Sequence, residues 1–389
     1  MILRIYFTAI TLFLFIVASC NLEPEKKTAT TINIISKEAG QIKSDLIPDI
    51  VYDKFAKIIC GKIEKIPPNI DAIYYDSFAK KLNQKLIEID KVRLNPISKW
   101  NADALKRNST SDTTPVFYPF SGGDFLHLNS LYPNANHYVM MAKESVGSIP
   151  DFDAMDKSET KSYILAVDNI LRDVYDKSYF ITKNMTKDIN STLVNGMLPV
   201  LLWSVSQTGH IVTKVEELSV DEFGNKTYKP FQVGESKATA VRITFGDPKV
   251  RIEKTLTYYS CDISDDGIEQ NRGLELTLKK IPPSNCFVKS ASYLMHYETF
   301  TKIRNIVMEK AIYLVQDDTG IPYKYFDKGK FKFELYGTYI EPVADFSSNL
   351  FQKDMAEAYK TNEFKSELLF SLGYHWQTKN QNQMIAIRN

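Results

Sequence analysis

The chain lacks the patterns by which many catalytic and metal sites are recognised. It has no G-x-S-x-G segment, and none of its histidines stands at an H-x-x-x-H or H-E-x-x-H spacing. The five histidines are scattered: His127, His137, His210, His296 and His375. The sequence therefore predicts no zinc or other metal and gives no support to a serine hydrolase built on a nucleophile elbow.

The chain also has almost no net charge. It carries 48 basic and 47 acidic side chains over 389 residues, and no basic patch marks a nucleic-acid partner. A content of 44% apolar and 12% aromatic residues is far from that of disordered or fibrous proteins. The composition therefore predicts a folded protein with a large core and no nucleic-acid partner.

Only one apolar run approaches membrane-spanning length, and it lies at the N-terminus. The run "IYFTAITLFLFIV" follows Arg4 and ends in "VASC" at Cys20. It is too short to span a bilayer but suits a secretory signal, and "VASC" resembles the lipobox of bacterial lipoproteins. We expect residues 1–19 to be removed and Cys20 to carry acyl chains such as palmitate. The domain would then face the periplasm or the cell surface, anchored to a membrane of the cell envelope.

Few cysteines remain after Cys20. Cys60, Cys261 and Cys286 would lie in a compartment where disulfides persist, and this leaves two alternatives. Either Cys261 and Cys286 form one bridge, or all three thiols are reduced and buried.

The rest of the chain divides by composition and periodicity. Residues 20–45 are polar and predict a flexible tether, 46–104 predict a helical lead-in, and 105–389 predict an α/β domain. The predicted fold is a mixed sheet with a Rossmann-like first strand-helix-strand unit, and with antiparallel strands in the middle and at the C-terminus. We also expect a helix across "TFTKIRNIVMEKAIYLV" and a terminal hairpin between Leu369–Trp376 and Met384–Ile387.

The segment "PVFYPFSGGDFLHLNSLYPNANHYVMMAKE", Pro115 to Glu144, carries the candidate site. It predicts a strand at Val116–Phe120, a glycine turn, a short helix and a strand at Tyr138–Met141. Ligands of open α/β sheets bind at the carboxyl ends of such strands. The candidate binding residues are Tyr118, Ser121, Gly122, Gly123, Asp124 and Glu144.

Two interpretations of this segment stay open. In one, it resembles a divergent methyltransferase-like site, in which glycines admit the ligand and Glu144 holds ribose hydroxyls. In the other, the glycine turn only begins a helix within the core, with Asp124 as its N-cap. The full glycine-rich fingerprint is missing and Asp124 would repel a phosphate, so the sequence predicts no cofactor.

Two further acidic segments have structural explanations. "CDISDDGIE" has the alternating acids of a calcium loop, but Gly273 stands where the loop needs a glutamate, and Asp265 or Asp266 explains the pattern as a helix cap. "QDDTGIP" is expected to be a helix end followed by an acidic turn at Asp317 and Asp318.

Six segments together carry a family resemblance: "YPFSGGDFL", "YPNANHY", "KSASYLMH", "QDDTGIPYKYF", "LYGTYIEPV" and "FSLGYHW". The chain resembles, over roughly residues 100 to 389, an uncharacterised family of bacterial exported proteins and lipoproteins. The resemblance implies one coherent domain and no assigned activity. It also implies a hydroxyl residue at the position of Cys261, which argues against a disulfide there.

Two classes of function follow. The first is a lipid-anchored envelope protein that binds a small molecule, a glycan or a protein without catalysis. The second is an exported enzyme, a hydrolase or a divergent methyltransferase-like protein, that uses the Ser121–Asp124 turn. A deep cleft over that turn, with a carboxylate beside His127 or His296, would favour the enzyme.

Overall fold

The computed structural model describes residues 45–105, 114–179, 193–234, 236–362, 365–375 and 380–389. Residues Lys43–Asn389 form one compact unit. The expected signal peptide, Cys20 and nearly all of the expected tether lie outside the described residues. Within the described residues, no helix is both long enough and apolar enough to cross a membrane.

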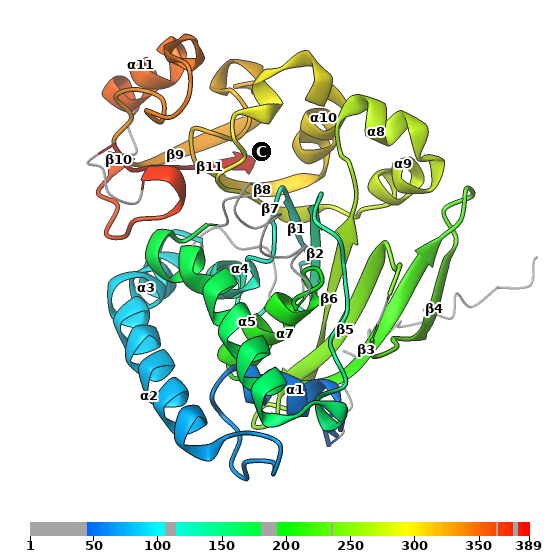
Figure 1. Cartoon of the computed structure of the whole chain (residues 1–389). Helices are drawn as coiled ribbons and strands as arrows, with labels where there is room; N and C mark the ends of the chain where they lie inside the picture. The colour runs from blue at the N-terminus through cyan, green and yellow to red at the C-terminus, as the bar shows by residue number, and fades with distance from the viewer. Residues whose placement is uncertain (1–44, 106–113, 180–192, 235, 363–364, 376–379) are drawn as a thin grey trace, which may run out of the picture. The chain divides into compact units, whose positions relative to one another are not determined.

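The described strands form one 11-stranded sheet with the order β10-β9-β11-β8-β7-β1-β2-β6-β5-β3-β4 (Figure 1). Their bounds are β1 Val116–Pro119, β2 His137–Ala142, β3 Ile211–Val220, β4 Lys226–Pro230, β5 Ala240–Asp247, β6 Ile252–Ser260, β7 Ser284–Val288, β8 Ala311–Gln316, β9 Phe331–Gly337, β10 Lys365–Ser366 and β11 Asn382–Arg388. The predicted α/β fold with a mixed sheet is confirmed.

The centre of the sheet is parallel. β6, β2, β1, β7 and β8 pair in that order, all in one direction. Numbered along the chain, these strands have the order 3-2-1-4-5, as in the Rossmann fold. The chain turns to one side of β1 for β2 and β6 and to the other for β7 and β8, so β1 lies at a topological switch point. The predicted Rossmann-like unit is confirmed.

The two flanks of the sheet are antiparallel. β5 pairs with β6 and β3, and β3 pairs with β4. On the other flank β11, the last strand of the chain, lies between β8 and β9 and is antiparallel to both. β9 consequently runs parallel to β8, and both predicted antiparallel regions are present.

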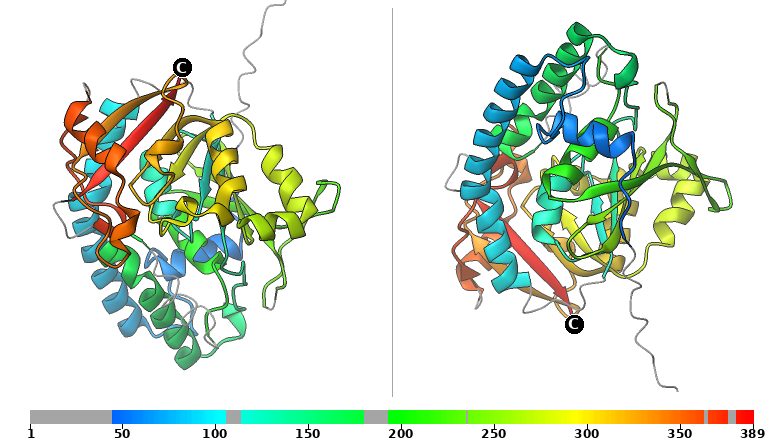
Figure 2. Two further views of the ribbon diagram at one scale, coloured as in Figure 1. Left: turned by 90° about the horizontal axis from the view of Figure 1, so that it is seen from above. Right: turned by 90° about the horizontal axis from the view of Figure 1, so that it is seen from below.

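Helices cover both faces of the sheet (Figures 1 and 2). On one face lie α1 Tyr52–Ile59, α2 Ala72–Ile89, α3 Asn95–Trp100, α4 Phe125–Leu131, α5 Lys157–Lys177 and α7 Leu198–Gln207. On the other lie α8 Asp265–Gln270, α9 Arg272–Lys279, α10 Thr301–Lys310 and α11 Lys353–Thr361. The helical lead-in is therefore part of a layer, and α2 runs beside α5 in both views of Figure 2.

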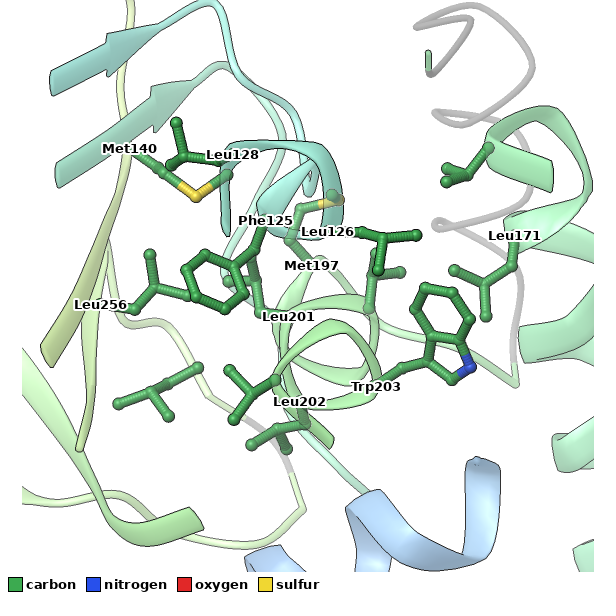
Figure 3. Close-up of a cluster of buried hydrophobic side chains, with 14 of the residues drawn as sticks. Phe125, Leu126, Leu128, Met140, Leu171, Met197, Leu201, Leu202, Trp203 and Leu256 are labelled. Atoms are coloured by element: carbon green, nitrogen blue, oxygen red, sulfur yellow. The ribbon is translucent and has the colours of Figure 1, made fainter. Parts of the chain in front are cut away.

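Strand alternation produces two hydrophobic cores. Val116 and Tyr118 of β1 face the first core, whereas Phe117 faces the second. In the first core, α7 is buried against α1, α4, α5 and β3 (Figure 3). Trp203 and Phe125 are both fully buried there. This packing fixes α4, and with it the turn that follows β1.

Local residues set the start of both α7 and α5. Pro199 stands in the first turn of α7, where its missing amide costs nothing, and Gly196 precedes the helix with φ +79°. α5 is capped by Asp156, which accepts hydrogen bonds from the amides of Ser158 and Glu159.

The predicted terminal hairpin is wrong. β11 has β8 on one edge and β9 on the other, so no edge is left for residues 369–376. Phe370 and Leu372 of that run are buried outside any strand, and a 3₁₀ turn follows at Gly373–His375. Trp376 lies outside the described residues.

The helix predicted across residues 299–315 is also too long. α10 ends at Lys310, and Ala311–Gln316 is strand β8, which pairs with β7 and β11. The buried run "AIYLVQ" has no helical end signal, and only its two strand neighbours decide its conformation. Asp317 and Asp318 therefore follow a strand rather than a helix.

The described cysteines Cys60, Cys261 and Cys286 are free. Cys261 follows β6 and Cys286 lies in β7, with β1 and β2 between those strands. Three strand spacings of about 4.8 Å separate the two, beyond the ~7 Å that a disulfide allows between Cα atoms. Of the two alternatives, the structure has the reduced one.

Candidate functional site

A cleft of about 470 Å³ opens at the carboxyl ends of β1, β2, β6 and β7. Because these four strands are parallel, the residues that follow them meet at one edge of the sheet. This edge lies at the switch point, where open α/β sheets bind their ligands. The cleft therefore occupies the position that the fold offers for a ligand, and its volume lies in the usual range for small-molecule sites.

A buried ion pair forms part of the floor of the cleft. Asp124, from the turn after β1, accepts a hydrogen bond from Nζ of Lys289, the residue that follows β7. Both line the cleft, yet only 3% of Asp124 and 2% of Lys289 is exposed. Lys289 also donates to the carbonyl oxygen of Ser178 at 2.5 Å. Breaking such a pair from one side leaves an uncompensated buried charge.

His127 supports this pair from behind. Its Nδ1 lies 2.5 Å from Oδ1 of Asp124, and its ring is fully buried on α4. Burial lowers the pKa of His127 to about 4 against the opposing charge of Asp124. The ring is therefore neutral at pH 7, donates from Nδ1 and does not line the cleft.

The carboxylate of Asp124 stays ionised in this setting. Burial raises its pKa, but the charges and hydrogen bonds of His127 and Lys289 outweigh burial and hold the pKa below its ordinary value. For Lys289, burial lowers the pKa and Asp124 opposes that effect. Lys289 is the cation of the pair, and Asp124 holds it in place.

The predicted N-cap role of Asp124 is wrong. Asp124 does precede α4, but its side chain makes no capping hydrogen bond to that helix. The carboxylate turns instead toward His127, Lys289 and the hydroxyl of Tyr118, which lies 3.4 Å from Oδ2. A charged partner outweighs an amide donor here because the carboxylate is buried.

Ser121 has no base beside it. Its hydroxyl donates to the carbonyl oxygens of Gly122 at 3.0 Å and Met141 at 3.2 Å, and only 4% of the residue is exposed. A serine nucleophile needs a partner that takes its proton, and a backbone carbonyl cannot do so. The Ser121 hydroxyl joins the turn to strand β2 through Met141. No histidine lies beside the Ser121 hydroxyl among the described residues.

The two glycines of the turn have different surroundings. Gly122 lines the cleft and has φ +52°, a conformation that favours glycine. Gly123 faces α7, and a Cβ there would lie 2.4 Å from Cε of Met197 and 2.7 Å from Cγ1 of Val200. Gly122 therefore leaves room at the cleft, whereas Gly123 lets α7 approach the turn.

The rim of the cleft is acidic on the side of β2 and β6. Glu144 lies just beyond β2, and its backbone carbonyl accepts a hydrogen bond from Tyr258 at 2.7 Å. Asp262 lies just beyond β6, where hydrogen bonds from Ser264 and then the ammonium of Lys143 lower its pKa to about 2. Two carboxyl groups and one exposed ammonium thus stand at this rim.

Aromatic side chains and strained backbone also line the cleft. Phe120 and Phe300 line the cleft with centroids 5.9 Å apart, and Tyr179 and Tyr374 do so at 4.6 Å. Several lining residues have positive φ, a conformation that costs free energy and clusters at functional sites. They are Phe120 at 59°, Ser290 at 53° and Ser292 at 52°.

Most of the predicted site residues meet at the cleft. Tyr118, Ser121, Gly122, Asp124 and Glu144 line it, and Gly123 does not. Of the two histidines considered as partners, His127 lies beside the carboxylate of Asp124, as the enzyme alternative expects, but its ring approaches from the buried side and does not line the cleft. His296 lines a different pocket beside α11. The segment Pro115–Glu144 thus supplies one half of the cleft.

The other half was missed from the sequence. Lys289, Ser290 and Ser292 follow β7, Asp262 follows β6, and Tyr374 reaches the cleft from the C-terminal region. A signal existed for Lys289, since a charged residue directly after the buried run "CFV" marks a strand end at the ligand edge. For Tyr374 there was none, because only the tertiary fold brings residues 371–375 to Ser178.

No metal centre is formed within the described parts of the chain, where no three His, Cys, Asp or Glu side chains gather. At the segment considered as a calcium loop, Ser264 caps α8 through the amide of Gly267, so the cap is neither Asp265 nor Asp266.

No protein-family model matches the chain, and no curated protein matches it either. The resemblance to exported bacterial lipoproteins therefore rests on the quoted segments alone. Several of these segments converge in the structure: "YPFSGGDFL", "KSASYLMH" and "FSLGYHW" supply cleft residues Asp124, Lys289 and Tyr374.

Proposed function

We propose that this protein is an exported lipoprotein, anchored to a membrane of the cell envelope through Cys20, whose α/β domain binds a small ligand in the cleft. The carrying observation is the cleft itself, which opens at the switch point and has the fixed Asp124–Lys289 pair in its floor. A non-catalytic site fits the surroundings of Ser121, whose hydroxyl is bound to backbone carbonyls.

The lining of the cleft suits a neutral ligand with hydroxyl groups and a flat apolar face. Carboxylates such as Glu144 accept hydrogen bonds from hydroxyls, and aromatic rings such as Phe120 and Phe300 stack on flat faces. The lining holds three carboxylates, at Asp124, Glu144 and Asp262, against the ammonium groups of Lys143 and Lys289, and this excess of negative charge disfavours a phosphate. Nucleosides and sugars are therefore the ligand classes to test.

Ligand binding is tested by thermal unfolding with a panel of nucleosides and sugars. A ligand at 100 times its dissociation constant stabilises the folded state by about 2.7 kcal/mol. Leu294→Trp fills the cleft from its lining and should abolish that shift. Ile340→Trp is the control, because Ile340 is exposed and lies outside the lining. A shift that survives Leu294→Trp would place the ligand elsewhere.

The lipid anchor is tested by Cys20→Ser. The short apolar run and "VASC" motivate this part of the proposal. The substituted protein should leave the membrane fraction, while the wild type stays there after a salt wash. Retention of the Cys20→Ser protein under the same wash would contradict a lipid anchor.

A second candidate is a methyltransferase-like enzyme, and the sheet favours it. An antiparallel last strand, β11, enters between the fifth and sixth parallel strands, β8 and β9, and this resembles the methyltransferase type of Rossmann-like sheet. Glu144 also follows the second strand, where an acidic residue binds ribose hydroxyls. Incubation with S-adenosylmethionine and a panel of methyl acceptors separates the candidates: S-adenosylhomocysteine formed together with a methylated acceptor, and lost in Glu144→Ala, supports the enzyme, whereas binding without transfer supports the first candidate.

A further inference from the structure

Three exposed apolar side chains within five residues mark the place where the N-terminal segment enters the domain. Ile47 is 77% exposed, Ile50 is 86% exposed and Val51 is 46% exposed. Val250 is 46% exposed on the loop between β5 and β6. We call Ile47, Ile50 and Val51 the entry patch. Large apolar groups at this exposure gain free energy when a partner removes them from water.

The entry patch is held rigidly on the domain. Asp45 forms an ion pair with Arg251 at 3.1 Å, which joins the start of the described chain to the β5–β6 loop. The amide of Asp49 donates to the carbonyl of Val212 at 2.8 Å. The Asp49 carboxylate in turn accepts from the amide of Val51 at 2.9 Å, at the start of α1. The patch therefore points outward in a fixed direction.

Little unpaired positive charge stands near the entry patch, where Lys249 on the β5–β6 loop is an exposed basic group without an ion pair among the described residues. Arg251 is paired with Asp45, and Lys54 lies 2.7 Å from the carboxylate of Asp153. A surface that recognises anionic lipid needs several unpaired basic groups, and these pairs supply none. The contact that the patch favours is therefore apolar and insensitive to salt.

We propose that the entry patch rests on the bilayer that holds the lipid anchor, with Ile47 and Ile50 inserted at its interface. This inference depends on the lipidation of Cys20 proposed above. Only 24 residues, Asn21–Ser44, separate Cys20 from Asp45, so the chain enters the domain at most about 80 Å from the bilayer. The anchor raises the local concentration of lipid at the domain, and the entry patch is the exposed apolar surface at the point where the chain enters it. The patch then supplies a second, weak apolar attachment beside the acyl chains.

The proposal is tested on the full lipidated chain in vesicles of neutral phosphatidylcholine. A polarity-sensitive fluorophore is attached at Ile50→Cys, with Leu369→Cys as the control. Leu369 is 71% exposed and lies near edge strand β10, far from the β5–β6 loop in the strand order. At position 50 we expect a blue shift of the emission and quenching by lipid-borne quenchers, and at position 369 neither. The signal at position 50 should stay the same in 0.5 M salt, roughly three times physiological ionic strength.

A substitution gives a second readout that needs no label. The substitutions Ile47→Ser and Ile50→Ser are made together in the Cys20→Ser chain, which has no lipid. Its partition onto the same vesicles should be roughly tenfold or more below that of the chain with both isoleucines, because each isoleucine contributes apolar burial. Leu369→Ser should leave partition unchanged. Both sites are exposed, so folding is unaffected.

The outcomes separate the two proposals. If the wild type stays on membranes but position 50 behaves like position 369, the patch proposal fails and the anchor stands. If the wild type is absent from membranes, both fail. If position 50 is already shielded in the lipid-free Cys20→Ser chain, a protein contact covers the patch and the lipid proposal is overturned.

Discussion

Two acidic turns follow parallel strands of the same sheet, and they have different surroundings. The turn after β1 contains Ser121–Asp124, and the turn after β8 contains Asp317 and Asp318. Both turns are buried, and all three aspartates are at most 3% exposed. The first turn borders the cleft, whereas neither aspartate of the second lines it.

The second turn is held by neutral donors. Oδ2 of Asp318 lies 2.5 Å from the hydroxyl of Tyr293, and its Oδ1 lies 3.0 Å from Nδ2 of Asn382. Asp317 accepts from the amide of Ser290 at 3.0 Å and from the hydroxyl of Thr319 at 2.5 Å. Tyr293 comes from the segment after β7 and Asn382 from β11, so this network joins distant parts of the chain.

The first turn is held by a charge. Asp124 pairs with Lys289, and that ammonium also reaches the carbonyl of Ser178, which caps α5. The same local pattern, an acid after a buried strand, thus forms a structural network in one place and the floor of a cleft in the other. The residue that pairs with the acid, rather than the acid itself, decides whether the turn is structural or borders a cleft.

The largest expected effect is at Asp124. Asp124→Ala leaves Lys289 buried without a counter-ion and should lower the free energy of unfolding by roughly 3–5 kcal/mol. Loss of a helix cap alone would cost about 1 kcal/mol. Urea unfolding at pH 7 measures the difference.

The control for this prediction removes the stranded charge. Asp124→Ala combined with Lys289→Met should be more stable than Asp124→Ala alone, because no unpaired ammonium remains. A loss near 1 kcal/mol for the single variant, with no recovery in the double variant, would contradict the buried-pair interpretation.

Acid should weaken the first turn. The pKa of His127 falls from 6.5 to about 4 on folding, so between those pH values the unfolded chain binds more protons. The free energy of unfolding therefore falls as pH drops through this window, by up to about 3 kcal/mol for this residue. Below it, protonation of Asp124, whose pKa is also depressed, removes further stability.

The variant His127→Asn tests whether His127 causes this fall of the free energy of unfolding with pH. Asparagine retains a donor for Asp124 but does not titrate, so stability should depend less on pH between 6.5 and 4 than in the wild type. His210 and His296, whose pKa values burial also lowers to about 4, keep part of the slope in both proteins. Equal slopes in wild type and variant would exclude His127 as its source.

A smaller effect is expected at the second turn. Asp318→Ala leaves the hydroxyl of Tyr293 and the amide of Asn382 without this acceptor, which should cost about 2 kcal/mol. No unpaired charge results, so the loss should be below that of Asp124→Ala. Ligand binding in the cleft should persist, and a larger loss than at Asp124 would reverse the comparison.

The smallest effect is expected from reduction. Since Cys60, Cys261 and Cys286 are free, a thiol reductant should change the melting temperature by less than about 1 °C. A clear fall in melting temperature would show a disulfide that the strand order forbids.

Much of the fold followed from local patterns. Periodicity and turn residues identified the strand-helix-strand unit of β1, α4 and β2, the lead-in helices and the antiparallel strands β3 and β5. The errors fell where two conformations suit the same residues. The apolar run "AIYLVQ" suits a helix as well as a strand, and the run around Leu369 suits a strand as well as a buried loop. In both runs the neighbouring strands decide the conformation.

Half of the candidate site followed from the sequence for the same reason. Tyr118, Ser121, Gly122, Asp124 and Glu144 lie within one short segment, so local order alone brought them together. Lys289 and Tyr374 are separated from that segment by more than a hundred residues. Their approach depends on the positions of β7 and β11 in the sheet, which no local pattern specifies.

By itself the sequence determined the α/β class and the presence of a turn that ends β1, because both depend on residues close together in the chain. Only the tertiary structure decided that Asp124 is paired with Lys289 instead of capping α4. A buried carboxylate takes the partner that neutralises it, and that partner is found only when the sheet places the ends of β1 and β7 side by side.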